Sequence, residues 1–252
     1  MLKNMNERID DLKISGLKII QNKEYFLFGM DSVLLANTVS SNSASDVIID
    51  LCTGSAVIPI LLTARVKSKC IIGVELQTAM YELAIRNVEM NRVGNEVHVM
   101  KEDIKNEKKI LCNIKELTGK EKADIVICNP PYKKVGTGSL NEEEVRYNAR
   151  HEILCDLEDI FKTSSKILRS KGKLYMVHKP ERLADLITLA RKYNLEIKNL
   201  TMLQPSLKKK PSILLLEYVR DGGNESSISP VIIEYDEDGK YTEEIKNIYC
   251  ID

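Results

Sequence analysis

Short apolar runs alternate with helical patterns along most of the chain. A run of four to six apolar residues predicts a buried strand, and apolar residues that recur every three or four positions predict an amphipathic helix. Strands are predicted over 46–50, 70–75, 96–103, within 122–132, and over 173–179, 195–203 and 212–220. Helices are predicted over 55–66, 78–92, 156–171 (ended by Gly172) and 180–194, with a shorter one closing 25–39.

This alternation predicts an α/β fold with a doubly wound, Rossmann-like sheet of seven strands, mostly parallel and covered by helices on both faces. The last two predicted strands have no helix between them. They therefore predict an antiparallel C-terminal hairpin at the edge of the sheet. The polar, glycine-containing stretch 133–150 predicts a loop beside a site.

Polar or small residues follow four of the predicted strands, where ligands bind in open α/β sheets. The first strand runs into "DLCTGSA" (50–56), whose small residues let the backbone approach a ligand at the start of a helix. The second ends at Glu75, an acid placed to accept hydrogen bonds from ribose hydroxyls. The third ends at Glu102 and Asp103, where an acid can accept from an adenine amino group, and the fourth ends at Asn129. These four ends predict one composite site.

Composition narrows the class of protein. The 252 residues suit one full-sized α/β domain with modest additions, and 43% hydrophobic residues supply a core. No apolar run approaches the ~18 residues of a membrane span, and the polar N-terminus does not resemble a signal peptide. Six cysteines form no C-x-x-C pair and only three histidines occur, so a cytoplasmic protein without a metal site is expected.

Charge is unevenly spread along this neutral chain. Residues 221–252 carry nine acidic residues and two lysines, which leaves 35 basic and 28 acidic residues, a net of +7, on residues 1–220. A polyanionic partner is therefore compatible with the composition, provided that its binding face is local.

The motifs "DLCTGSA", "GVELQ", "KEDI" and "NPPY", in this order, resemble those of class I S-adenosylmethionine-dependent methyltransferases. "NPPY" resembles the motif that marks the branch of this family that methylates a planar exocyclic or amide nitrogen. Cys52 and Ala56 stand where this family usually has glycine.

Three flanking blocks make the resemblance more specific. "FGMDSVLLA" (28–36), "ARHE" (149–152) and "IIEYDEDGKYTEE" (232–244) are similar to bacterial tRNA1(Val) adenine-N6-methyltransferases, which modify the adenine immediately 3′ of a valine anticodon. The resemblance implies methyl transfer from S-adenosylmethionine to the exocyclic N6 of an adenine in tRNA, adenine 37 of tRNA1(Val). It also implies an N-terminal segment, 1–45, over the cofactor site, a methyltransferase domain, 46–220, and an acidic C-terminal extension, 221–252.

The resemblance also implies site residues. Those expected to bind the cofactor are Phe28, Met30, Asp31, Asp50, Leu51, Cys52, Thr53, Gly54, Glu75, Leu76, Glu102, Asp103, Ile104 and Asn129. Those expected to bind the tRNA are Pro131, Tyr132, Lys133, Lys134, Arg146, Arg150, His151, Lys208, Lys209 and Lys210. A monomer that uses no metal and binds no membrane is expected.

Asn129, Pro130 and Tyr132 are expected to carry the chemistry. The lone pair of an exocyclic amino nitrogen is delocalised into the purine, so the nitrogen is a poor nucleophile. The Asn129 side-chain oxygen and the Pro130 carbonyl can accept its hydrogens and favour the tetrahedral form that attacks the methyl group. The prolines at 130 and 131 stiffen the loop, and Tyr132 can stack on a base that has left its own stack.

Other functions remain open from the sequence alone. DNA or rRNA adenine methyltransferases and glutamine methyltransferases also carry NPPY. DNA adenine methyltransferases normally need a sizeable target-recognition region, and no 100-residue insertion exists here. Glutamine methyltransferases have a helical domain of some 70 or more residues before the cofactor motif, where only 45 residues precede it here. A small-molecule O-methyltransferase has no need of NPPY. A non-enzymatic cofactor-fold binding module is the rival from another class.

Overall fold

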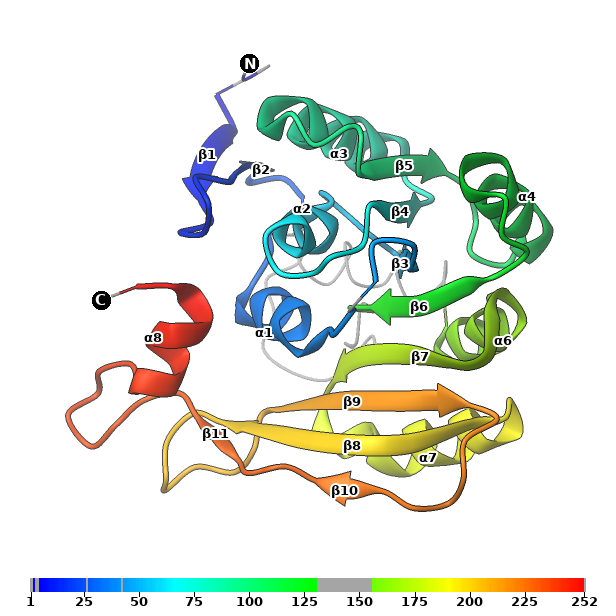
Figure 1. The fold of residues 1–252 in the computed structure, drawn as a ribbon. Coiled ribbons are helices and arrows are strands. Elements are labelled where there is room, and N and C mark those ends of the chain that lie inside the picture. The colour runs from blue at the N-terminus through cyan, green and yellow to red at the C-terminus, as the bar shows by residue number, and fades with distance from the viewer. Residues whose placement is uncertain (1, 3–4, 26, 42, 131–155, 252) are drawn as a thin grey trace.

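A nine-stranded sheet forms the centre of the molecule in the computed structural model, which describes residues 2, 5–25, 27–41, 43–130 and 156–251. All seven predicted strands are present (Figure 1). They are β3 (Val47–Leu51), β4 (Cys70–Glu75), β5 (Val97–Lys101), β6 (Ala123–Cys128), β7 (Leu168–His178), β8 (Leu195–Gln204) and β9 (Ile213–Arg220). The spatial order is β10-β8-β9-β7-β6-β3-β4-β5, with β11 also paired to β8.

Strand direction confirms the predicted mostly parallel sheet. β5, β4, β3, β6 and β7 pair in parallel, whereas β9 runs antiparallel to both β7 and β8. The predicted C-terminal hairpin is therefore the β8–β9 pair. Two short strands, β10 (Ser227–Ile228) and β11 (Ile232–Ile233), add to the outer edge of β8 in parallel and were not predicted.

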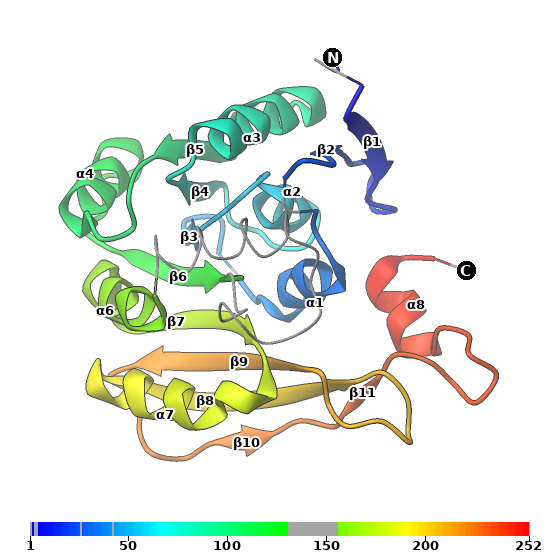
Figure 2. The same ribbon diagram turned by 180° about the vertical axis from the view of Figure 1, so that it is seen from behind.

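Two hydrophobic cores lie on opposite faces of the sheet. Successive strand residues such as Ile48 and Ile49 belong to different cores, because side chains alternate across a strand. One face is covered by α1 (Met30–Thr38), α2 (Val57–Thr63) and α3 (Thr78–Asn91), and the other by α4 (Glu107–Thr118), α6 (Leu157–Ile167) and α7 (Leu183–Lys192), as Figures 1 and 2 show. Within the described ranges, no helix is long and apolar enough to cross a membrane.

The helix predicted over 156–171 is shorter in the structure than in the prediction. α6 ends at Ile167 and β7 begins at Leu168, so Gly172 lies inside a strand rather than ending a helix. The reason is a bulge, since Ala123 of β6 pairs with Leu168 but Ile125 pairs with Lys173. A Cβ atom on Gly172 would lie 2.9 Å from the Arg169 carbonyl oxygen, so only glycine fits this bulge.

Helix α4, between β5 and β6, was not predicted at all. Only Ile110 and Ile114 are fully buried on it, amid charged residues. Two apolar positions one turn apart make a narrow stripe, which is a weak periodic signal. Gly119, with a φ of 72°, ends the helix as a left-handed cap.

Within the segment 1–45, which was expected to lie over the cofactor site, a hairpin of β1 (Glu7–Asp11) and β2 (Lys18–Asn22) packs on α3. Two asparagine side chains of α3 form hydrogen bonds with the backbone of β2, as a neighbouring strand would. The Asn87 Oδ1 atom accepts from the Ile20 N–H (2.7 Å) and its Nδ2 donates to the Ile20 and Ser55 carbonyls (3.2 and 3.0 Å). Asn91 binds both backbone groups of Lys18 in the same way.

The acidic C-terminal extension is structured and returns to the domain. β11 pairs with the carboxyl end of β8, and α8 (Glu243–Tyr249) packs against α1 (Figure 1). Arg65 joins these elements, since it donates to Asn37 Oδ1 and to the Ile248 carbonyl, each at 2.6 Å. The Tyr241 ring stacks between Tyr235 and Tyr249, with centroids 5.1 and 6.2 Å away. The extension therefore supports α1 from outside.

Candidate active site

The order of the strands places a switch point between β3 and β6. From β3 the chain proceeds through α2 and α3 to β4 and β5 on one side, and then returns through α4 to β6 on the other side of β3. Connections diverge above the carboxyl ends of such neighbouring strands and leave room for a ligand. The predicted site residues of β3 and β6 therefore flank the position where a ligand is expected in this fold.

The loop after β3 has an unusual backbone. Cys52, Gly54 and Ala56 all lie in the left-handed region, with φ values of 60°, 59° and 64°. For a residue with a Cβ atom this conformation costs about 1–2 kcal/mol, and glycine adopts it readily. This explains physically why a family would place glycine at positions 52 and 56. The small Cys52 and Ala56 side chains keep the same backbone path into α2.

Two carboxyl groups are buried beside this loop. Asp50 is 1% exposed, its Oδ2 atom accepts from the Thr53 hydroxyl (2.6 Å), and its Oδ1 atom has no hydrogen-bond partner among the described residues. Glu75 is 5% exposed and accepts from the backbone N–H groups of Gly54 (2.9 Å) and Gln77 (2.8 Å). Burial raises the pKa of Asp50 to about 8 and that of Glu75 to about 7. A ligand that carries positive charge and hydroxyl donors would satisfy this pair.

The Asn129 side chain forms hydrogen bonds with residues at the N-terminus of α1. Its Nδ2 atom donates to the Ser32 hydroxyl (2.9 Å), and the Asp31 carboxylate accepts a hydrogen bond from the same side chain. Asp31 and Ser32 are 8% and 2% exposed, and Pro130 is buried. The structure thus brings the "FGMDS" stretch and the "NPP" stretch together at the carboxyl end of β6.

The third strand end is partly occupied by local ion pairs. Glu102 contacts Lys109 (2.9 Å), whose hydrogen bond lowers the pKa of Glu102, and Asp103 accepts from the Lys105 N–H (2.9 Å). Ile104 is 4% exposed and its side chain belongs to the core under α4 and α6.

The remaining predicted cofactor residues differ in their surroundings. Leu51 is fully buried in the same core as Ile104, so its side chain is structural. Leu76 is exposed. Phe28 and Met30 are partly buried and pack against the core on the α1 side. Their backbone or exposed edges, rather than whole side chains, are the parts that a ligand can reach.

Most predicted substrate residues lie outside the described residues. These are Pro131, Tyr132, Lys133, Lys134, Arg146, Arg150 and His151. Lys208, Lys209 and Lys210 are described and exposed, in the loop after β8. β8 runs in the same direction as β6, and the two strand axes lie three spacings, about 14 Å, apart, so this loop leaves the same edge of the sheet as the site.

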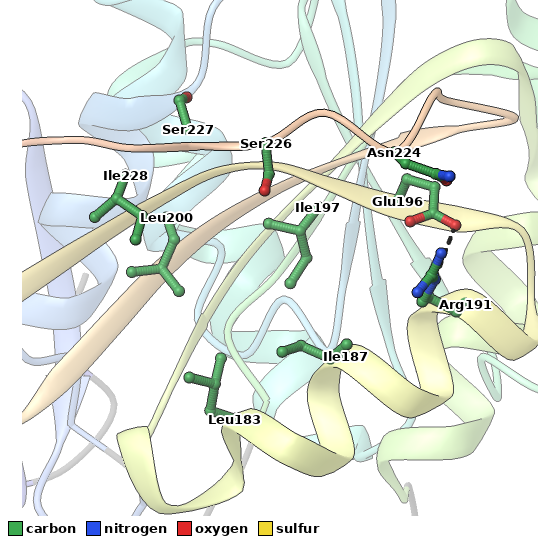
Figure 3. Close-up of a pocket in the computed structure, with 10 residues that line it drawn as sticks. All are labelled: Leu183, Ile187, Arg191, Glu196, Ile197, Leu200, Asn224, Ser226, Ser227 and Ile228. Atoms are coloured by element: carbon green, nitrogen blue, oxygen red, sulfur yellow. Dashed lines mark hydrogen bonds and ion pairs between the residues drawn. The ribbon is translucent and has the colours of Figure 1, made fainter.

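A groove of about 550 Å³ lies elsewhere, between α7, β8 and the chain at β10 (Figure 3). Its apolar walls are Leu183, Ile187, Ile197, Leu200 and Ile228, and an ion pair between α7 and β8 closes one end. None of the strand-end residues lines it. The groove is therefore separate from the candidate active site.

Sequence reasoning missed two residues near Asn129. Ser32 lies 97 positions away in the chain, inside the block "FGMDSVLLA" but not among the residues expected to form the site. Lys179, directly after β7, is close enough to Asp31 to lower its pKa, against the stronger upward effect of burial. The available signals were the block around Ser32 and the position of Lys179 directly after a predicted strand.

The strand order, the left-handed loop after β3, and the acid and asparagine at the neighbouring strand ends define a Rossmann-like transferase of the class I methyltransferase type. Comparison with protein families agrees, because the profile of the methyltransferase small domain matches residues 28–194. The chain belongs to this family of methyltransferases, whose members use S-adenosylmethionine.

Individual relatives are more distant. The chain is 26% identical over 193 residues to a tRNA1(Val) (adenine(37)-N6)-methyltransferase of Porphyromonas gingivalis, covering 75% of this chain and 73% of that protein. It is 25% identical over 221 residues to the enzyme of that name from Histophilus somni, covering 87% of each.

Solved structures support the fold. A predicted O-methyltransferase from Agrobacterium tumefaciens superimposes with a TM-score of 0.68 at 21% identity, covering 88% of this chain and 96% of that one. A tRNA m1G37 methyltransferase of M. jannaschii gives 0.57 at 14% identity, covering 88% and 57%. At these identities the similarity concerns architecture alone.

Proposed function

We propose that this protein transfers a methyl group from S-adenosylmethionine to the exocyclic N6 of an adenine in tRNA, with adenine 37 of tRNA1(Val) as the target. The main observation behind this proposal is the Asn129 amide. It is hydrogen-bonded to α1 at the carboxyl end of β6, beside the switch point, and a buried Pro130 follows it. The activity after which the two relatives are named supports the same substrate.

The described residues fit the cofactor. The partnerless, buried Asp50 Oδ1 atom suits a cationic amino group, and a buried carboxylate without a partner is costly. Glu75 would accept from ribose hydroxyls, the backbone of Cys52 to Gly54 would line the cofactor, and Asp103 would accept from its adenine amino group. When bound, S-adenosylmethionine supplies an electrophilic methyl group on a sulfonium centre.

The residues after β6 would prepare the acceptor nitrogen. The Asn129 Oδ1 atom and the Pro130 carbonyl would accept the two amino hydrogens and draw the nitrogen toward a tetrahedral geometry. Because Pro130 has no N–H, it offers no donor that would compete for the same acceptors. Tyr132 would stack on the flipped base and hold its ring in place.

Lys208, Lys209 and Lys210 would contact tRNA phosphates at the same edge of the sheet. The loop leaves the same edge of the sheet as β6, from a strand whose axis lies about 14 Å from that of β6. The lysines and Asn129 can therefore engage one tRNA together, and Lys133, Lys134, Arg146, Arg150 and His151 would extend that contact.

The test is methyl transfer from labelled S-adenosylmethionine to bulk bacterial tRNA, with nucleosides identified by mass spectrometry. Wild type is expected to form N6-methyladenosine, and Asn129→Ala is expected to lose about 100-fold or more in rate at saturating cofactor. Asn224→Ala is the matched control, because this exposed asparagine lies in the groove of Figure 3, away from the strand ends.

Mapping the product in purified tRNA1(Val) then tests the position. Methylation at adenine 37 alone supports the full proposal. Transfer to DNA, to rRNA or to a protein glutamine, with none to tRNA, would overturn the substrate and keep the chemistry. An absence of cofactor binding would overturn the enzyme assignment itself.

A further inference from the structure

The amide of Asn129 has two ends with opposite hydrogen-bonding character, and the reaction needs only one of them. Its Oδ1 atom accepts and its Nδ2 atom donates. Rotation by 180° about the last side-chain torsion would exchange the two atoms. The Nδ2 donor would then face the exocyclic nitrogen that receives the methyl group, and it would repel the hydrogens of that amino group. Some group must therefore select one orientation.

Helix α1 provides that selection. Asp31 accepts a hydrogen bond from the Asn129 side chain, which only Nδ2 can donate, and the Ser32 hydroxyl binds the same nitrogen at 2.9 Å. The carboxylate is itself held, because its Oδ1 atom accepts from the Ser32 N–H at 2.9 Å. With Nδ2 turned toward α1, Oδ1 is on the opposite side of the amide.

The supporting helix is rigid by burial. Every residue from Asp31 to Ala36 is buried, and α8 and Arg65 hold the helix from outside. Gly29 leaves room for the carboxylate, since a Cβ atom there would lie 3.0 Å from Asp31 Oδ1. A group fixed on a packed helix positions its partner more accurately than a loop does.

We propose that Asp31 and Ser32 are positioning residues, which hold the Asn129 amide with its nitrogen toward α1 and its oxygen toward the methyl acceptor. This inference rests on the proposed function. It differs from the cofactor contact that the family resemblance implies for Asp31. The two roles make different predictions for cofactor affinity.

The experiment compares Asp31→Ala, Asp31→Asn, Ser32→Ala and the control Ser41→Ala. Ser41 is also buried but binds Asp46 at the far end of the α1 segment, at 2.7 Å. Single-turnover methylation of tRNA1(Val) at saturating S-adenosylmethionine gives the rate, and calorimetry gives the cofactor Kd. Circular dichroism confirms that each variant is folded.

A positioning role predicts a split between rate and affinity. Asp31→Ala is expected to lower the rate about 10- to 100-fold and Ser32→Ala about 3- to 10-fold, with cofactor Kd within about twofold of wild type. Asp31→Asn keeps the shape of the side chain but introduces an amide donor, so it no longer selects one orientation of Asn129 and is expected to remain slow. Ser41→Ala is expected to match wild type.

Two outcomes overturn the inference without touching the proposed function. One is an unchanged rate in Asp31→Ala and Ser32→Ala while wild type remains active. The other is a large rise in cofactor Kd with an unchanged rate at saturation, which makes Asp31 a cofactor ligand. A wild type that methylates no tRNA is instead a failure of the proposed function.

Discussion

Replacing Asp50 by asparagine is expected to stabilise the fold while weakening cofactor binding. Burial raises the pKa of Asp50 to about 8 from an ordinary value of 3.8. A carboxyl group whose folded-state pKa is raised loses stability as pH climbs from the unfolded-state value toward the folded-state value. The free energy of unfolding of the wild type therefore falls from about pH 4 upward because of this charge. A neutral asparagine of the same shape does not lower it.

The size of the effect follows from the shift. Each pH unit between the two pKa values adds about 1.4 kcal/mol, so the penalty grows by roughly 4 kcal/mol between pH 5 and pH 8. For a domain of this size, 1 kcal/mol moves Tm by about 2–4 °C. The Tm of Asp50→Asn relative to wild type is therefore expected to rise by about 10 °C across that range.

Thermal unfolding at several pH values, followed by circular dichroism, measures this difference. Asp124→Asn is the matched control at the opposite end of the sheet. Burial works to raise the pKa of Asp124, but hydrogen bonds from Lys120 (2.8 Å) and Arg169 (2.6 Å) outweigh it and lower the pKa. Its stabilisation is present above the unfolded-state pKa and fades as pH falls, so Asp124→Asn is expected to be destabilising near neutrality and less so in acid.

A relative Tm of Asp50→Asn that is the same at pH 5 and pH 8 would refute the reasoning. It would mean that the Asp50 charge is compensated in the folded protein, and the partnerless Oδ1 atom would then have a solvent or ionic partner. Titration calorimetry on the same variant tests the predicted loss of cofactor affinity. A cofactor Kd equal to that of wild type would contradict the proposed contact between Asp50 and the cofactor.

Three further predictions follow from the same structure. Cys52→Gly is expected to unfold at higher denaturant than Cys52→Ala, by about 1 kcal/mol, because φ is positive there; equal stabilities would contradict the strain. Asn87→Ala is expected to cost on the order of 3 kcal/mol in urea unfolding, since it leaves buried groups of Ile20 and Ser55 without partners; a cost below about 1 kcal/mol would show that the hairpin docks by other contacts. Triple alanine replacement of Lys208, Lys209 and Lys210 is expected to weaken tRNA binding and to reduce the slope of log affinity against log salt by about 2, with cofactor Kd unchanged; an unchanged slope would exclude these lysines from the tRNA contact.

The periodicity of the chain was sufficient for the central architecture. Seven apolar runs predicted seven strands, and the alternation with helices predicted a parallel sheet, because burial on both faces demands near-continuous apolar strands. It failed where local patterns were weak or overridden. Helix α4 has too narrow an apolar stripe, and a bulge at Gly172 turned the expected end of a helix into a strand.

The candidate site divides in the same way. The order of the strand ends was readable from sequence, and with it the acids at Asp50 and Glu75 and the amide at Asn129, since parallel strands bring their carboxyl ends to one edge. What only the tertiary structure decided is the contact of Ser32 with Asn129, across 97 positions, and the return of α8 onto α1. Such contacts depend on how helices pack over a finished sheet, and packing leaves no periodic trace in the residues that it joins.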